Sequence, residues 1–211
     1  MNTTRMCMAV AATMLIAGMT GCSSDKAKTD NASATLENLQ KAFSGESNAK
    51  ARYEAFAKKA DEEGYLGVSG LFRAAAKAEA NHAAKFEKQI VKLGAVAKLV
   101  AVAPEVKTTK ENIQAAINGE TDESTNIYAA FAEQATADKN NDAAHAFSGT
   151  AKVEAAHASL YSEILAKMED LKKAKKDYAL CPVCGFVATA DADIKKCPVC
   201  FEPREKFEIV N

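Results

Sequence analysis

The chain has no tryptophan, only three histidines and no excess of charge of either sign among its 211 residues. Its 27 lysines and arginines face 28 aspartates and glutamates, which gives a formal net charge of -1. Proteins that bind nucleic acid concentrate positive charge, so this balance gives no support for a nucleic-acid partner. The absence of tryptophan, together with abundant alanine, lysine and glutamate, favours a helical protein.

The N-terminus has no apolar run long enough to span a bilayer comfortably. Met6 to Met19 form a short apolar stretch after the positive charge of Arg5, which is the pattern of an export signal. Small residues then precede Cys22 and polar residues follow it, as in a bacterial lipoprotein signal. We therefore predict a signal peptide over residues 1–21 and a lipid on Cys22, where two or more acyl chains would give stable anchoring. An ordinary signal peptide or an uncleaved anchor is the alternative.

These features also predict the compartment. A lipid at the start of the mature chain would anchor the protein to a bacterial cell membrane on the periplasmic side. Many lipoproteins retained in the inner membrane have aspartate at the position of Ser23. An anchor in the outer membrane is therefore also consistent with the sequence. The segment before the apolar run contains no pair of arginines. We therefore expect the chain to cross the membrane unfolded and to take up metal outside the cytoplasm.

The rest of the chain divides into a helical part and a short cysteine-rich part. Residues 22–34 are small and polar and are expected to form a flexible tether. Periodicity and helix breakers predict four helices, with short loops within each pair and a long link between the pairs. Two hairpins joined by a crossover are typical of an all-α ferritin-like four-helix bundle. The predicted bundle spans 35–173, with helices at about 35–63, 68–93, 109–139 and 143–173, followed by a hinge at 174–179 and a metal module at 180–211.

The motif Glu-x-x-His occurs twice, at Glu79 and His82 and again at Glu154 and His157. Residues i and i+3 share a helix face, so each motif points a carboxylate and an imidazole at one spot. A single motif of this kind is commonly a solvated pair. Two in register, each inside the longer pattern Phe-x-x-x-Ala-Lys-x-Glu-x-x-His, indicate a carboxylate-bridged two-metal site within the bundle.

The first helix of each hairpin supplies further candidates. Glu46 and Glu120 each follow a glycine and precede a tyrosine, Tyr53 and Tyr128, by about two turns. Hydrogen bonds from these tyrosines to metal-binding carboxylates are one role for them, and core packing is the alternative. The second copy has one extra residue and one extra acid, Glu123. Oxygen-rich sets with a few imidazoles suit iron or manganese, and the candidate ligands are Glu46, Glu79, His82, Glu120, Glu123, Glu154 and His157.

Four of the six cysteines lie close to the C-terminus, as two Cys-Pro-Val-Cys knuckles joined by a short segment. Two Cys-x-x-Cys pairs at this spacing indicate a tetrahedral four-thiolate metal site. Zinc and iron both suit such a site, and disulfides are a further alternative in an exported protein. The four candidate ligands are Cys181, Cys184, Cys197 and Cys200.

Taken together, these features resemble rubrerythrin, a ferritin-like two-iron domain followed by a rubredoxin-like domain. The resemblance covers essentially all of residues 36–211. It rests on Gly-Glu-Ser at 45–47, Ala-Arg-Tyr at 51–53, both Glu-x-x-His motifs, Gly-Glu-x-x-Glu at 119–123 and the pattern from Cys181 to Glu208.

The resemblance implies a role for each candidate ligand. Glu79 and Glu154 would bridge two irons, and Glu46 and Glu120 would complete the carboxylate set. Glu123 and His82 would be alternative ligands to one iron, and His157 would hold the other. The four cysteines would hold a single iron.

The resemblance also implies an activity, namely reduction of hydrogen peroxide to water with electrons returned through the four-cysteine iron. It further implies a head-to-tail homodimer in which one subunit's rubredoxin-like iron lies near the other's two-iron site. The export signal departs from the family pattern. Because soluble NAD(P)H is absent outside the cytoplasm, we expect an unidentified membrane-linked or periplasmic electron donor. Oxidation or binding of Fe(II) and a non-catalytic redox sensor are the alternative functions.

Overall fold

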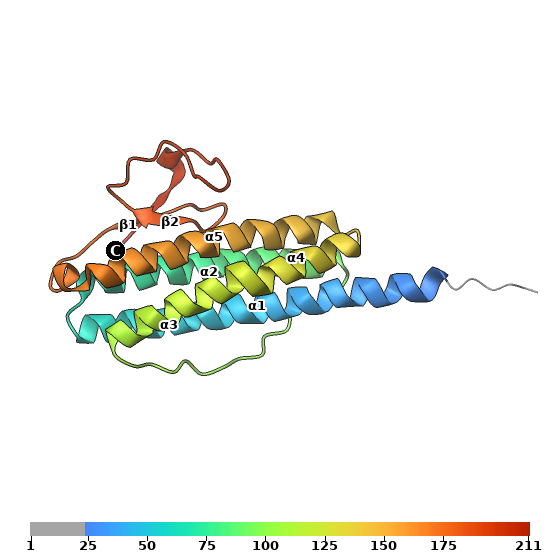
Figure 1. Cartoon of the computed structure of the whole chain (residues 1–211), viewed down its shortest axis with the longest axis horizontal. Helices are drawn as coiled ribbons and strands as arrows, with labels where there is room; N and C mark the ends of the chain where they lie inside the picture. Colours follow the sequence, from blue (N-terminus) through green and yellow to red (C-terminus); the bar gives the residue numbers. More distant parts are fainter. Residues whose placement is uncertain (1–23) are drawn as a thin grey trace, which may run out of the picture.

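The computed structural model describes residues 24–211, and the predicted signal peptide and Cys22 lie outside the described residues. Within this part, no helix is both long and apolar enough to cross a membrane. The long helices form an antiparallel bundle (Figure 1), as the sequence predicts. The helical elements are α1 Ser24–Glu62, α2 Leu66–Lys92, α3 Thr109–Asp122, the π-helical η1 Glu123–Ile127, α4 Tyr128–Ala137, α5 Asn141–Ala166 and the 3-10 turn η2 Met168–Leu171.

The first helix is longer than predicted. α1 begins at Ser24, so helix replaces the flexible tether expected over residues 22–34 wherever that segment is described. The segment is polar, but it contains neither glycine nor proline. Polarity alone does not end a helix, whereas those two residues do.

The predicted third helix is divided by a π turn. α3 starts at a capping box between Thr108 and Glu111, and the π-helical η1 then inserts between α3 and α4. A π turn accommodates one extra residue within a helix, which is the extra residue that separates Glu120 from Tyr128 relative to the first hairpin. The last helix is shorter than predicted, because α5 ends at Ala166 and a 3-10 turn follows.

Aromatic side chains pack the bundle on both sides of its centre. Tyr53, Phe72 and Tyr161 have ring centroids 5.6 to 5.9 Å apart on one side. Phe86 and Phe147 lie on the other, with ring centroids 5.3 Å apart. Burial of side chains this large dominates the stability of the bundle, and the two clusters leave a polar layer between them.

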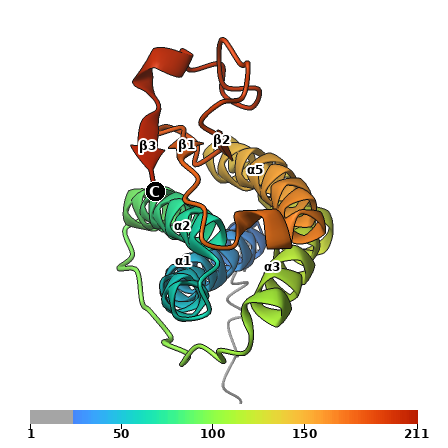
Figure 2. The ribbon, with the colours of Figure 1, turned by 90° about the vertical axis from the view of Figure 1, so that its left-hand side faces the viewer.

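The C-terminal module is a three-stranded antiparallel sheet with its strands in the order β2-β1-β3. Its strands are β1 Tyr178–Leu180, β2 Val187–Thr189 and β3 Glu208–Val210. The sheet lies against α2 and α5 of the same chain (Figure 2). The predicted hinge at 174–179 therefore extends too far toward the C-terminus, because β1 begins at Tyr178. Tyr178 is fully buried, and its hydroxyl donates a hydrogen bond to the carbonyl of Gly67, 2.9 Å away.

Candidate metal centres

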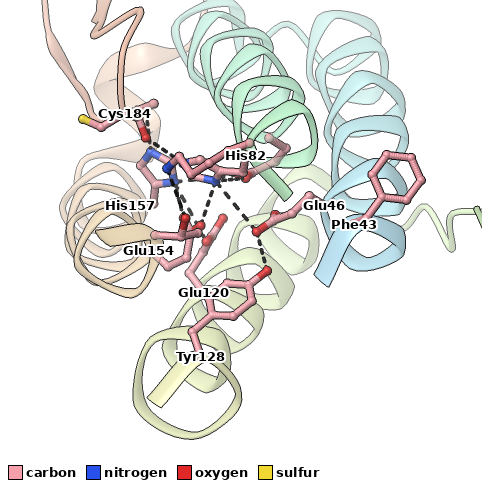
Figure 3. Close-up of polar contacts among 12 residues, drawn as sticks. Phe43, Glu46, His82, Glu120, Tyr128, Glu154, His157 and Cys184 are labelled. Atoms are coloured by element: carbon pink, nitrogen blue, oxygen red, sulfur yellow. Dashed lines mark hydrogen bonds and ion pairs between the residues drawn. The ribbon is translucent and has the colours of Figure 1, made fainter. Parts of the chain in front are cut away.

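Six of the seven predicted bundle ligands converge in the polar layer at the bundle centre (Figure 3). Each is at most 2% exposed. They come from four helices: Glu46 from α1, Glu79 and His82 from α2, Glu120 from α3, and Glu154 and His157 from α5.

These side chains form two overlapping sets of four, each with one ligand atom per residue within 4.8 Å of the others. The first set contains Glu46 and His82, and the second contains Glu120 and His157. Glu79 and Glu154 belong to both. Shared carboxylates between two sets of terminal ligands are the arrangement of a carboxylate-bridged two-metal site.

The buried carboxylates are suited to bind cations. Oxygens of Glu46, Glu79, Glu120 and Glu154 are buried without a hydrogen-bond partner. Leaving such atoms unpaired is costly, and two metal ions would satisfy them. The donor set of four carboxylates and two imidazoles suits iron, so the residues fit the metal that the sequence predicts.

The histidines are oriented by the C-terminal module. The Nε2 atom of His82 lies 2.8 Å from the carbonyl oxygen of Cys184, and that of His157 lies 3.0 Å from the carbonyl oxygen of Gly185. A carbonyl only accepts, so each Nε2 carries the proton and donates it. Each Nδ1 therefore faces the carboxylates, and in the neutral ring it offers a lone pair to a metal.

The electrostatics agree with this assignment. Burial, followed by the charges of Glu79 and Glu154, raises the pKa of Glu46 and of Glu120 well above the usual range. Burial alone would lower the pKa of His82, but the charges of Glu154 and Glu79 outweigh it and raise this pKa to about 10. Without metal, the cluster therefore holds protons where a cation would otherwise compensate the negative charge.

The tyrosines bond across the bundle rather than within their own hairpin. Tyr53 donates a hydrogen bond to Glu120 Oε1 at 2.5 Å, and Tyr128 donates one to Glu46 Oε1. Each hairpin thus orients a carboxylate of the other. Hydrogen bonds to carboxylates were predicted for both tyrosines, but the exchange of partners was not.

Glu123 is the one predicted bundle ligand outside the two sets. It begins the π turn and is half-buried. Burial, with the charges of Glu154 and Glu79, raises its pKa to about 8. His145, the third histidine, is exposed on α5 and belongs to neither set.

The four cysteines cluster in the C-terminal module. Their Sγ atoms lie 3.5 Å apart between Cys181 and Cys200 and 3.4 Å apart between Cys184 and Cys197. A disulfide would require about 2.05 Å, and all four are free. Thiolates at about 2.3 Å from a tetrahedral metal are about 3.8 Å apart, so the cluster is close to the size of a metal site.

The sequence did not predict the contact between the two centres. Gly185 directly follows the first knuckle, and a Cβ there would lie 2.5 Å from His82 Nε2. Its φ of +90° also favours glycine. Arg52 was missed as well: it lies over the Tyr53 ring, 5.3 Å from the centroid. Gly185 and Arg52 both lie within the motifs that carry the family resemblance. Their roles become visible only from the packing of the folded chain.

Models of two families match the chain. A model described as rubrerythrin matches residues 37–165 and, in an overlapping match, residues 111–180. A model described as rubrerythrin, rubredoxin-like domain, matches residues 180–208.

Relatives match over most of their length. Nigerythrin of Nitratidesulfovibrio vulgaris is 36% identical over 175 residues, which cover 82% of this chain and 85% of nigerythrin. Rubrerythrin of Porphyromonas gingivalis is 37% identical over 186 residues, covering 86% of this chain and 92% of that protein. The structure of fully reduced, all-ferrous nigerythrin matches with a TM-score of 0.77 at 34% identity, covering 83% of this chain and 86% of that one.

A bacterioferritin of Desulfovibrio desulfuricans shares the fold, with a TM-score of 0.65 at 19% identity over 70% of this chain and 92% of that one. With the geometry above, the family matches assign a diiron centre to the glutamate and histidine cluster and one iron to the four cysteines.

Proposed function

Because this chain belongs to the rubrerythrin family, we propose that it is a non-haem diiron peroxidase that reduces hydrogen peroxide to water and protects the cell against oxidative stress. A diiron redox centre and a rubredoxin-like iron on one chain support this proposal. Peroxide reduction consumes two electrons and two protons and yields two waters. With iron bound, the glutamate and histidine cluster would hold two ferrous ions able to supply these two electrons, and the four cysteines would hold an iron able to donate electrons one at a time.

One observation carries the proposal. Consecutive carbonyls of the first knuckle, at Cys184 and Gly185, accept hydrogen bonds from the two histidines of the diiron cluster. A short bonded path therefore joins a thiolate ligand of the electron-transfer site to the centre that it would reduce. Iron storage has no need of such a path, and a zinc-bearing sensor has no electron to send along it.

The protein's own residues prepare this chemistry. Tyr53 and Tyr128 hold Glu120 and Glu46 in place, so that these carboxylates face the metals. Aromatic clusters flank the centre on both sides, and the six ligands are each at most 2% exposed. Glu123 begins the π turn beside the site, where its carboxyl can pass on the protons that the reaction consumes.

We further propose, on the N-terminal sequence alone, that the protein is exported and lipid-anchored at Cys22, facing the periplasm. Its electron donor would then be membrane-linked or periplasmic. The head-to-tail homodimer stays a prediction, but the chain does not need it to join its two centres, because the module already lies over its own bundle.

The test is turnover with a defined donor. The iron-loaded chain from Ser23 to Asn211, supplied with a reductant for the four-cysteine iron, should consume hydrogen peroxide catalytically and oxygen much more slowly. Loading with excess Fe(II) should stop near three irons per chain, one for each metal position. Uptake of many more irons, with no preference for peroxide, would instead support iron oxidation and storage.

A further inference from the structure

The two cysteine knuckles end in the same backbone turn but carry different residues there. Gly185 follows the first knuckle with a φ of +90°, and Phe201 follows the second with a φ of +64°. In each turn the backbone N–H of this residue donates to the carbonyl of the knuckle's first cysteine, Cys181 or Cys197, 3.0 Å away. This left-handed conformation favours glycine. Phe201 therefore holds a strained backbone position.

The surroundings of the two turns explain where a side chain fits but not why it is aromatic. At Gly185 a Cβ would collide with His82 of the bundle. The segment between β2 and β3, which carries the second knuckle, lies on the side of the sheet away from the helices (Figure 2). Phe201 is 65% exposed there, so burial of its ring does not offset the strain. A large aromatic side chain that is both strained and exposed indicates a contact outside the chain.

Phe201 directly follows the most accessible ligand of the four-cysteine site. Cys200 is partly exposed, whereas the other three cysteines are buried. The first knuckle faces the diiron cluster, because the carbonyl of Cys184 bonds to His82. The second knuckle therefore gives the four-cysteine site its outward side, and an electron from another molecule would reach the iron most directly at Cys200.

The exposed ring has a positive charge beside it. The Nζ atom of Lys196 lies 4.9 Å from the centroid of the Phe201 ring, and a backbone bridge between Lys196 and Pro203 holds this lysine next to the knuckle. The neighbouring Lys195 and Lys206 instead pair with carboxylates at 3.1 and 2.5 Å. Among the described residues, Lys196 forms no such ion pair, so its charge remains available to an acidic partner.

We propose that Phe201 and Lys196 form the docking point for the electron donor of the four-cysteine iron, and that this donor is a one-electron carrier protein with an acidic surface. The inference rests on the proposed peroxidase function, which requires a donor. The aromatic ring supplies the apolar anchor of the contact, and the lysine steers the acidic partner. One electron passes from the donor's cofactor to the ferric iron, which becomes ferrous while the donor is oxidised, and no bond forms or breaks.

Stopped-flow reduction tests the docking point. The iron-loaded chain from Ser23 to Asn211, with its four-cysteine iron oxidised, is mixed with reduced flavodoxin, an acidic one-electron carrier, or with dithionite. Phe201→Gly should raise the flavodoxin concentration for half-maximal rate roughly tenfold and leave the dithionite rate unchanged. Phe201→Tyr keeps a ring and should behave as wild type. Ile209→Ala is the matched control, because Ile209 is also exposed on the module but lies beside side chains of the bundle.

Two readouts separate docking from a structural role. Phe201→Gly relieves the backbone strain, so the iron content should match wild type and the midpoint of chemical denaturation should be at least as high. Slower reduction by flavodoxin in a chain that is no less stable would then reflect the lost contact. Lys196→Gln should weaken the dependence of the flavodoxin rate on ionic strength, because it removes the steering charge.

Three results would overturn the proposal. Flavodoxin reduction of Phe201→Gly at the wild-type rate would place the docking point elsewhere. An equal change in the rates with flavodoxin and dithionite would mean that the ring only shields Cys200 from solvent. Slower return of the Fe(III)-thiolate colour with one equivalent of peroxide and no donor would mean that the ring serves transfer between the metal centres. The reductions are measured without peroxide, so they test the docking point separately from the proposed peroxidase activity.

Discussion

The first hairpin (α1 and α2) and the second (α3 to α5) bring corresponding residues to the metal centre, but the second brings one more. Glu46 corresponds to Glu120, and each Glu-x-x-His motif has its counterpart. Glu123, three residues after Glu120, corresponds instead to Ala49, which is buried and has no metal-binding group. The difference coincides with the π turn. A single inserted residue therefore accompanies the change from a symmetric set of candidate ligands to an asymmetric one.

The symmetric ligands and Glu123 have different roles. The symmetric residues form two equivalent sets of four, each able to hold one metal ion. Glu123 stands outside both sets but is close enough for its charge to act on Glu46 and Glu120. In the proposed peroxide reduction, this extra carboxylate would make the two metal positions inequivalent.

Loss of a shared carboxylate should have the largest effect, because it damages both hairpins' sites. Glu154→Ala leaves two histidines facing an unpaired cluster, at a cost of about 3–5 kcal/mol, or on the order of a thousandfold in iron affinity. Peroxide turnover should fall in proportion to the iron lost, measured by metal analysis. The control is Glu163→Ala, an exposed acid on the same helix, and equal iron content in the two variants would contradict the assignment.

Removal of Glu123 should make the carboxylates from the two hairpins symmetric, while both sets of four metal ligands stay complete. Glu123→Ala should keep the wild-type iron content but lower peroxide turnover by roughly 10- to 100-fold. Turnover at the wild-type level would mean that the asymmetry of the hairpins has no role in the reaction. Loss of one iron would show that Glu123 is needed to hold metal rather than to assist the chemistry.

Substitution of Gly185 should separate the two centres. Gly185→Ala introduces a Cβ 2.5 Å from His82 Nε2 at a φ of +90°, so the knuckle must move away from α2. Electron transfer between the centres should slow by about tenfold, with all metals retained. Gly149→Ala is the control, since a Cβ there meets nothing within 4 Å. Unchanged transfer would show that the contact does not connect the centres.

The crossed tyrosines should behave alike. Tyr53→Phe and Tyr128→Phe each remove one hydrogen bond to a buried carboxylate of the opposite hairpin, a loss of about 1.5–3 kcal/mol in the free energy of unfolding. Chemical denaturation of the iron-loaded variants should give losses that agree within about 1 kcal/mol. A much larger loss of unfolding free energy for one tyrosine would show that the two crossed hydrogen bonds contribute unequally to stability.

Iron removal should make stability fall with rising pH. Glu46, Glu120 and Glu123 have raised pKa values in the folded chain, so they hold protons that the unfolded chain releases. His82, whose pKa is also raised, loses its stabilising proton as pH approaches 10. The iron-free chain should therefore melt several degrees lower at pH 8.5 than at pH 6. The iron-loaded chain serves as the control, and a pH-independent gap between the two would contradict compensation by metal.

Local patterns predicted the ligands but not how the parts pack. Glu-x-x-His and Cys-x-x-Cys fix their own geometry through a helix turn or a tight knuckle, so Glu79, His82 and Cys184 could be assigned from spacing. The π turn was not predictable, because an extra residue before Tyr128 fits a bulge or a longer loop equally well. The bond from His82 to Cys184 joins residues 102 positions apart, and no local pattern encodes it.

The central claim is that the diiron centre reduces peroxide and draws electrons from the four-cysteine iron through the contact at Cys184 and Gly185. The most direct test is stopped-flow spectroscopy of the fully reduced, iron-loaded chain mixed with one equivalent of hydrogen peroxide or, in parallel, oxygen. We predict rapid return of the Fe(III)-thiolate colour with peroxide and slow return with oxygen. Equal rates with both oxidants, or a four-cysteine iron that stays reduced while peroxide is consumed, would contradict the claim.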